Sequence, residues 1–96
     1  MRNEHLIDTI KLQMSIYDFL KTLPSSCYFF PSDHSCCSIV GSVGGQAVFI
    51  LITTKNKMTK KQITFSSGVY QSLGEFYCIR SLDDILEIAK IRGWHD

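Results

Sequence analysis

The chain has 96 residues, a length that supports one hydrophobic core, and we expect a single domain over residues 1–96. Its hydrophobic fraction of 45% and aromatic fraction of 11% are typical of a folded domain and exclude a disordered tail. The formal net charge of +1 excludes a global basic field, so nucleic-acid binding would require a local basic patch.

Nothing in the sequence predicts a membrane span or an export signal. No stretch approaches the roughly 20 apolar residues that a membrane-spanning helix requires, and acids interrupt the first ten residues. We therefore expect a soluble, cytoplasmic protein. In that compartment Cys27, Cys36, Cys37 and Cys78 should stay reduced and pack mostly as small hydrophobic side chains.

The chain begins with a predicted helix and a short strand. Asn3 can cap the helix with its side-chain oxygen, and Leu23-Pro24 ends it because the residue before a proline leaves the α region. Cys27–Phe30 is the expected strand, which Pro31 stops. The apolar residues expected on the inner face of the helix are Leu6, Ile7, Ile10, Met14, Tyr17 and Leu20, with Leu12, Ile16 and Phe19 widening the stripe.

The middle of the chain predicts a hairpin. Its first strand should start at Cys36 or Cys37 and end at Val43, after which Gly44-Gly45 supplies the positive φ values that a tight turn requires. Residues 48–52 are apolar and rich in β-branched side chains, which favours a strand buried on both faces and central in the sheet.

A basic turn and a second helix follow. Within seven residues the chain carries the four lysines Lys55, Lys57, Lys60 and Lys61. The Thr59-x-x-Gln62 spacing predicts a capping box, in which two side chains satisfy the free backbone donors of a helix start. Gly68 weakens this helix by roughly 1 kcal/mol relative to alanine, and Gly74 should end it. The expected inner face consists of Ile63, Phe65, Val69, Tyr70 and Leu73.

A last strand and helix complete the order α-β-β-β-α-β-α. The strand is expected at Phe76–Ile79, and Ser81 should cap a helix that ends near Gly93. Its expected inner residues are Leu82, Ile85, Leu86 and Ala89. A helix that crosses between the third and fourth strands implies that these two are parallel. We therefore predict an α/β fold with a mixed four-stranded sheet flanked by helices.

This order, with the residues that carry it, resembles the virus-type replication-repair nuclease module (VRR-NUC), a branch of the PD-(D/E)xK superfamily. The resemblance covers nearly the whole chain and implies a restriction-endonuclease-like fold. The segments that match the family pattern in order, and nearly in spacing, are Glu4, Gly44-Gly45, Val48–Ile50, Met58–Gln62, Leu73-Gly74, Phe76–Ser81 and Asp83-Asp84.

The chemistry of the family is missing from the corresponding positions. Its E-x-K motif falls on Leu51 and Thr53, and its aspartate falls on Cys37 or Ser38. Leucine cannot ligate the Mg²⁺ or Mn²⁺ that oxygen ligands would hold, and threonine cannot replace the lysine that assists the attacking water. The residues that survive are Glu4 and Gln62. The resemblance thus predicts the fold. The replaced residues lead us to expect that the protein has no catalytic residues, no metal and no cofactor.

Each remaining signal has two interpretations. The four lysines are either a phosphate-contacting loop or solvated surface charge, and they are the predicted nucleic-acid-binding residues. Glu4 is either a relic ligand or an acid stabilised by the dipole of the helix start, which we favour. Gln62 either reaches the old active-site cleft or only closes the helix cap, and the cap is sufficient to explain it.

The segment Asp33–Cys37 places histidine and cysteine close together. Such residues can bind zinc, but no second ligand pair at zinc spacing lies nearby, and the same residues could form a cysteine nucleophile with a histidine base. We favour neither. Residues 28–30 are aromatic and either stack on bases or, as we favour, belong to the core. Trp94 either anchors a partner or folds back on the domain.

The sequence therefore favours a non-catalytic nuclease-like binding module, in other words a pseudoenzyme. It would contact a protein partner and, through the lysine turn, nucleic acid, as a phage or mobile-element inhibitor or accessory protein, and it would form a homodimer. The alternative is a metal-dependent DNA nuclease that uses Mg²⁺ or Mn²⁺ with relocated carboxylates. Its replacement residues would be Asp33, Glu4 and Glu75, with Lys55 as the lysine. A third possibility is an interaction domain that touches no nucleic acid.

Overall fold

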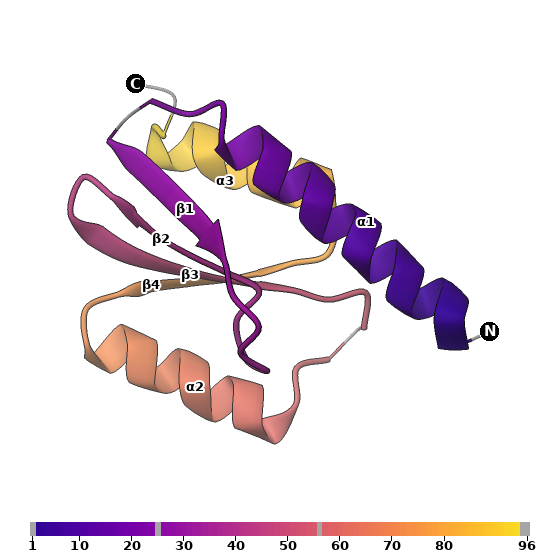
Figure 1. The fold of residues 1–96 in the computed structure, drawn as a ribbon. Coiled ribbons are helices and arrows are strands. Elements are labelled where there is room, and N and C mark those ends of the chain that lie inside the picture. The colour runs from indigo at the N-terminus through magenta and orange to yellow at the C-terminus, as the bar shows by residue number, and fades with distance from the viewer. Residues whose placement is uncertain (1, 25, 56, 95–96) are drawn as a thin grey trace.

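The computed structural model describes residues 2–24, 26–55 and 57–94, with side chains described from residue 8 onward. Three helices and four strands form three layers, in which α1 and α3 cover one face of the sheet and α2 covers part of the other (Figure 1). The elements in chain order are α1 (Arg2–Leu20), β1 (Cys27–Pro31), β2 (Ile39–Val43), β3 (Gln46–Ile52), α2 (Lys60–Gln71), β4 (Glu75–Ile79) and α3 (Leu82–Arg92).

The sheet has the strand order β1-β2-β3-β4, and the predicted α/β fold with its element order is confirmed. Strands β1, β2 and β3 are antiparallel neighbours, whereas β3 and β4 are parallel, because α2 carries the chain across the sheet between them. Gly44 and Gly45, with φ of 57° and 88°, form the tight turn of the β2–β3 hairpin.

Strand β3 is central and separates two apolar clusters. Val48, Ile50 and Ile52 point toward α1 and α3, whereas Leu51 points toward α2, where it packs with Val69. The predicted burial on both faces is therefore confirmed. Within the described residues, no helix is long and apolar enough to cross a membrane.

Two of the three predicted helix caps are present. Gln62 N–H donates to Thr59 Oγ1 at 3.1 Å, and Gln62 Oε1 accepts from Thr59 N–H at 2.8 Å, which completes the capping box of α2. Ser81 caps α3 by accepting from Asp84 N–H, and α3 ends at Gly93 in the left-handed conformation. These local signals fix where the two helices start.

Several predicted boundaries were wrong, among them the end of α2, where Leu73 rather than Gly74 takes the left-handed conformation. Helix α1 starts at Arg2, so Asn3 lies inside it rather than before it, and it ends at Leu20 instead of Leu23. The i to i+3 hydrogen bond from Leu23 N–H to Leu20 tightens the chain into a turn there. Strand β2 starts at Ile39, because residues 35–37 form a turn that is bonded to His34.

The predicted inner faces of the helices were only partly right. Val69 is buried and Phe65 half-buried, but Ile63, Tyr70 and Leu73 are exposed. Ile63 and Tyr70 lie seven residues apart on the side of α2 opposite Phe65 and Val69, so one face cannot hold all of them. The other residues that were expected inside but are exposed are Ile10, Met14, Leu82 and Leu86.

Trp94 folds back on the domain, which settles the choice left open by the sequence. Its side chain is 3% exposed and packs against Phe29 and Tyr77, with ring centroids 5.5 and 6.0 Å away. The thiol of Cys27 donates to the Trp94 carbonyl oxygen. The residue after α3 is thus part of the core between α3 and the sheet.

Both edges of the sheet are partly closed to further pairing. Just outside β1, the Ser26 carbonyl accepts from Gly44 N–H and Ser32 N–H donates to the Ser38 carbonyl. Because every second residue of an antiparallel strand bonds to its partner strand, the backbone groups of residues 27, 29 and 31 point outward. Of these, Cys27 N–H donates to the Pro24 carbonyl and Pro31 has no N–H. At the other edge, Tyr70 Oη donates to the Phe76 carbonyl of β4.

Gly41 in β2 is required by close packing. A Cβ atom at this position would lie 2.5 Å from the Tyr28 carbonyl oxygen and would overlap the Phe29 ring. The ring of Phe29 therefore occupies the space that a side chain at position 41 would need. Gly68 in α2 has no such role, since a Cβ atom there would meet nothing within 4 Å.

These two glycines provide a matched test of the packing. We expect Gly41→Ala to lower the free energy of unfolding by about 1–3 kcal/mol, because the methyl group displaces Phe29. Gly68→Ala should raise it by roughly 0.5–1 kcal/mol through helix propensity alone. Urea denaturation measures both changes, and a Gly41→Ala variant as stable as the wild type would contradict the packing.

Candidate nucleic-acid interface

The positions predicted from the resemblance to correspond to a nuclease site lie together at the carboxyl end of β3. Ser38 N–H donates to the Ile50 carbonyl at 2.7 Å, and Ser38 Oγ accepts from Ile52 N–H at 3.0 Å. Thr53 N–H donates to Ile79 of β4, and Thr53 Oγ1 accepts from Lys55 N–H. Both hydroxyl groups thus bond to local backbone.

Leu51, the position predicted to correspond to the glutamate of the VRR-NUC pattern, belongs to the core. Its side chain is 4% exposed and packs with Val69 and Phe76 beneath α2. Cys37 is also buried, and its thiol donates to the Ile39 and Ile50 carbonyls. Neither position presents a group that could ligate a metal to solvent.

Helix α1 borders this end of the sheet with neutral polar groups. Gln13 Nε2 donates to the Ser38 carbonyl, and Thr9 Oγ1 lies 3.5 Å from Thr54 Oγ1. Glu4 lies in the first turns of α1, more than one turn before Thr9, and its side chain is outside the described part of the chain. The described groups that meet here are hydroxyl and amide groups, which carry no charge.

The basic turn lies directly beyond this end of the sheet. Lys55, Lys57, Lys60 and Lys61 are all exposed, and none of them forms an ion pair with another described residue. Arg80 follows β4, and its Nε donates to the Lys55 carbonyl at 2.9 Å, which brings a fifth cation to the turn. Five cations therefore gather where β3 and β4 end and α2 begins.

Gln62 is occupied by the helix cap, as its two bonds to Thr59 show. Four described acids lie at this end: Asp84, which accepts from Arg80 N–H, its neighbour Asp83, Asp33 in the loop before β2, and Asp8 next to Thr9. None of them forms an ion pair with the four lysines, whose side chains all stay exposed.

The Asp33–Cys37 segment forms a compact turn. His34 Nδ1 accepts from Cys36 N–H at 3.1 Å, so this nitrogen is engaged, and the thiols of Cys36 and Cys37 are buried. Burial also raises the pKa of the Cys37 thiol, the opposite of what an activated nucleophile requires. Among the described residues, no three histidine, cysteine or acidic side chains are grouped as metal ligands.

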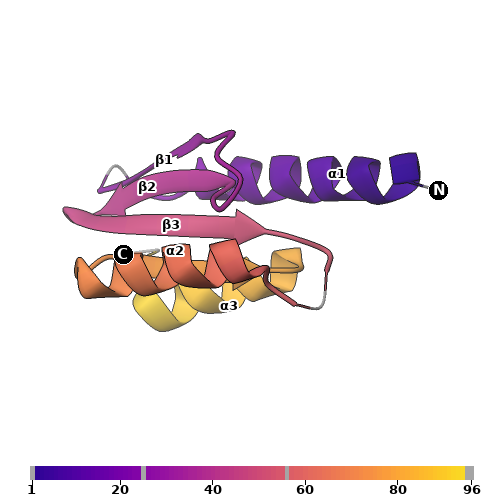
Figure 2. The ribbon, with the colours of Figure 1, turned by 90° about the horizontal axis from the view of Figure 1, so that it is seen from below.

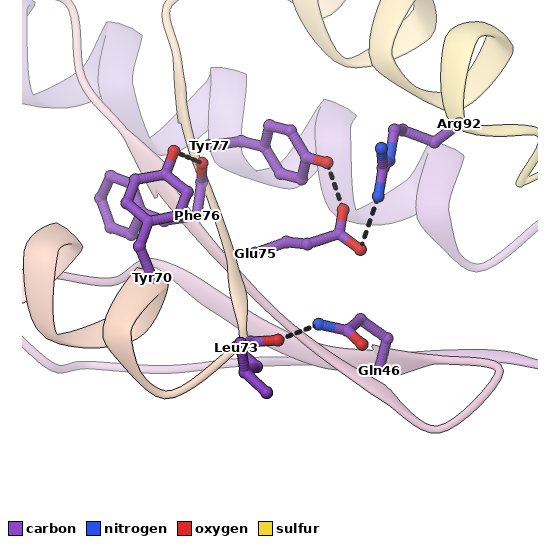
Figure 3. Close-up of polar contacts among 7 residues, drawn as sticks. All are labelled: Gln46, Tyr70, Leu73, Glu75, Phe76, Tyr77 and Arg92. Carbon is purple, nitrogen blue, oxygen red and sulfur yellow. Dashed lines mark hydrogen bonds and ion pairs between the residues drawn. The ribbon is translucent and has the colours of Figure 1, made fainter.

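Glu75 lies at the opposite end of the sheet. Figure 3 shows its carboxylate between the Tyr77 hydroxyl and Arg92, and the Glu75–Arg92 ion pair measures 2.9 Å. Glu75 pairs with Val48, three residues before the level of Leu51, which is about 10 Å along the strand. The structure does not bring Glu75 to the position that the relocated nuclease site would need.

Next to Glu75, the side chain of Gln46 donates to the Leu73 carbonyl (Figure 3). Leu73 has a φ of 65° and is 82% exposed, so the chain between α2 and β4 turns through a left-handed leucine that this bond holds. Desolvation and the hydrogen bond to Glu75 raise the pKa of Tyr77. This end of the sheet is stabilised by its own contacts and does not join the basic turn.

Two features were missed by sequence reasoning. One is a groove of about 440 Å³ between α2 and the sheet. The other is the exposure of residues 28 and 30 on β1, which were expected in the core. The exposure of residues 28 and 30 could have been predicted, because successive side chains of a strand point to opposite faces of the sheet and three consecutive aromatic residues cannot all face one layer. Phe29 alone is the core residue of that run.

A comparison of the chain with protein-family models, curated proteins and solved structures finds no match. The resemblance to the VRR-NUC module therefore stays a prediction that rests on the residues quoted above. The fold and the positions of the basic turn rest on the structure itself.

The cysteines should differ in reactivity. At pH 8 we expect iodoacetamide to modify the half-buried Cys78 before the buried Cys36 and Cys37, as peptide mass spectrometry can show.

The free energy of unfolding should fall as the pH rises above 9.0, the ordinary pKa of a thiol. The unfolded chain then ionises while the raised pKa of Cys37 keeps the folded thiol protonated.

A Cys37→Ala variant provides the control for the pH effect, since its unfolding midpoint should depend less on pH between 7 and 9.5. Modification of Cys37 in the native protein at the same rate as Cys78 would contradict its burial.

Proposed function

We propose that this protein is a non-catalytic nuclease-like binding module that contacts nucleic-acid phosphates through its basic turn and serves a protein partner rather than cutting DNA. The observation that carries the proposal is the contrast at the carboxyl end of β3. Leu51 and Cys37 are buried there, whereas the lysines just beyond are exposed. Binding groups are present at a site whose reactive groups are replaced.

The geometry of the basic turn supports phosphate binding. Exposed lysines release condensed counterions when they approach a phosphate backbone, and this supplies most sequence-independent affinity. Because Arg80 is bonded to the Lys55 carbonyl, its guanidinium is held beside the lysines. The capping box of α2 fixes Lys60 and Lys61 on the first turn of a helix, so at least two of the lysines have a defined backbone.

Salt-dependent binding tests the proposal. We expect the wild type to bind a fluorescein-labelled 20-base-pair duplex in anisotropy titrations, with an affinity that falls as KCl rises. A plot of log K against log[KCl] has a negative slope. Replacing Lys57, Lys60 and Lys61 with glutamine should make this slope shallower by about 0.9 for each phosphate contact removed.

The matched control replaces Lys11, Lys21 and Lys90 with glutamine on α1, the turn after it, and α3. Each set removes three positive charges and takes the formal net charge from +1 to −2, so the change in net charge is matched. Lys21 also forms an ion pair with Asp18, so urea denaturation should confirm that the control variant folds. Equal loss in both sets would reduce the effect to net charge, and absence of salt-dependent binding by the wild type would refute the proposal.

The proposal also predicts that the protein leaves DNA intact. Incubation of the wild type with single-stranded, duplex and branched DNA in Mg²⁺ or Mn²⁺ should yield no cleavage on denaturing gels, beside a metal-dependent nuclease as a positive control. Cleavage that requires the metal and is lost in Asp33→Asn would instead support the nuclease with relocated carboxylates.

A further inference from the structure

Helix α2 covers only half of its face of the sheet. It packs on β3 and β4 through Leu51, Val69 and Phe76, and Figure 2 shows β1 and β2 lying clear of it. On the uncovered half, Tyr28 is 61% exposed and Phe30 48% exposed. Their rings lie edge to face with centroids 6.0 Å apart, so the open surface carries an aromatic pair.

The surface between this pair and α2 is apolar and hollow. Across β2, Tyr28 and Phe30 pair with Ser42 and Val40, and the groove of about 440 Å³ follows on β3. The groove is lined by Ala47, Phe49, Thr64, Phe65, Gly68, Val69, Ser72 and Gly74. Gly68 lowers the wall of the groove, because a side chain there would project into open space.

The groove leads to the basic turn. Thr64, Phe65 and Gly68 face the groove, and Lys61 precedes them by three, four and seven residues, which places it on the same side of α2 one turn earlier. The loop after β1 borders this end, where the centroids of the His34 and Phe65 rings lie 5.3 Å apart. The aromatic pair of β1 and Lys61 thus lie on the same side of the sheet.

We infer that this surface binds single-stranded nucleic acid, with bases stacked on Tyr28 and Phe30 and the backbone running toward Lys61 and the basic turn. The inference rests on the proposed function and adds the class of nucleic acid. Single strands are bound by aromatic rings that accept any base, together with cations that follow the phosphates, and a base-paired duplex cannot offer its bases in this way. The lysines favour this occupant over an uncharged protein surface.

The test compares affinities for a fluorescein-labelled dT20 single strand and for the 20-base-pair duplex at one KCl concentration. The double variant Tyr28→Ala, Phe30→Ala should lose at least about fivefold in affinity for dT20, the loss of one stacked base, and keep its affinity for the duplex. The control variant Leu86→Ala, Ile91→Ala removes exposed apolar side chains from α3 and should change neither affinity. Circular dichroism and urea denaturation establish that both variants fold.

The outcomes separate the two proposals. Unchanged dT20 binding by the Tyr28→Ala, Phe30→Ala variant would overturn the inference, and so would wild-type binding to the duplex alone. Duplex binding that still depends on Lys57, Lys60 and Lys61 would leave the proposed function in place. If the wild type binds neither nucleic acid, both proposals fail. If the Tyr28→Ala, Phe30→Ala variant lost affinity equally for dT20 and the duplex, the two rings would contact both kinds of nucleic acid, and the single-strand inference would also be overturned.

Discussion

The structure depends on the burial of β3 on both of its faces. Ile50 and Ile52 lie against the layer of α1 and α3, and Leu51 lies against α2, so the strand contributes to both apolar clusters. A carboxylate at position 51 would be desolvated under α2 and would need a cation to hold it there. Leucine has no such need and adds apolar area to the core, so the residue at this position stabilises the fold.

The polar groups around the sheet divide between its two ends. At one end, Glu75, Tyr77 and Arg92 bond to one another and tie the start of β4 to the last turn of α3. At the other end, the hydroxyl groups of Ser38 and Thr53 satisfy backbone donors, and the lysines beyond them are exposed and form no ion pair with a described residue. Charge is therefore used for stability at one end and is available for binding at the other.

Local signals in the sequence predicted the order of elements, the Gly44-Gly45 turn and both caps, because each depends on a few neighbouring residues. The rotation of each helix was harder to predict. Ile63 and Tyr70 are as apolar as Phe65 and Val69, and only the position of α2 on the sheet decides which pair is inside. Of the candidate site, the basic turn could be located from sequence, but the approach of Arg80 could not, since it depends on β3 and β4 being parallel neighbours.

The partly closed edges of the sheet limit how this molecule can associate. In β1, Phe29 has an outward N–H, while Pro31 has none and that of Cys27 is already bonded, and in β4 the Phe76 carbonyl is bonded by Tyr70. A second strand added at β1 would find two of the three outward N–H positions closed, which makes this edge a poorer template for cross-β pairing. Exposure of aromatic residues on β1 therefore carries a smaller risk of aggregation than it would on a fully open edge strand.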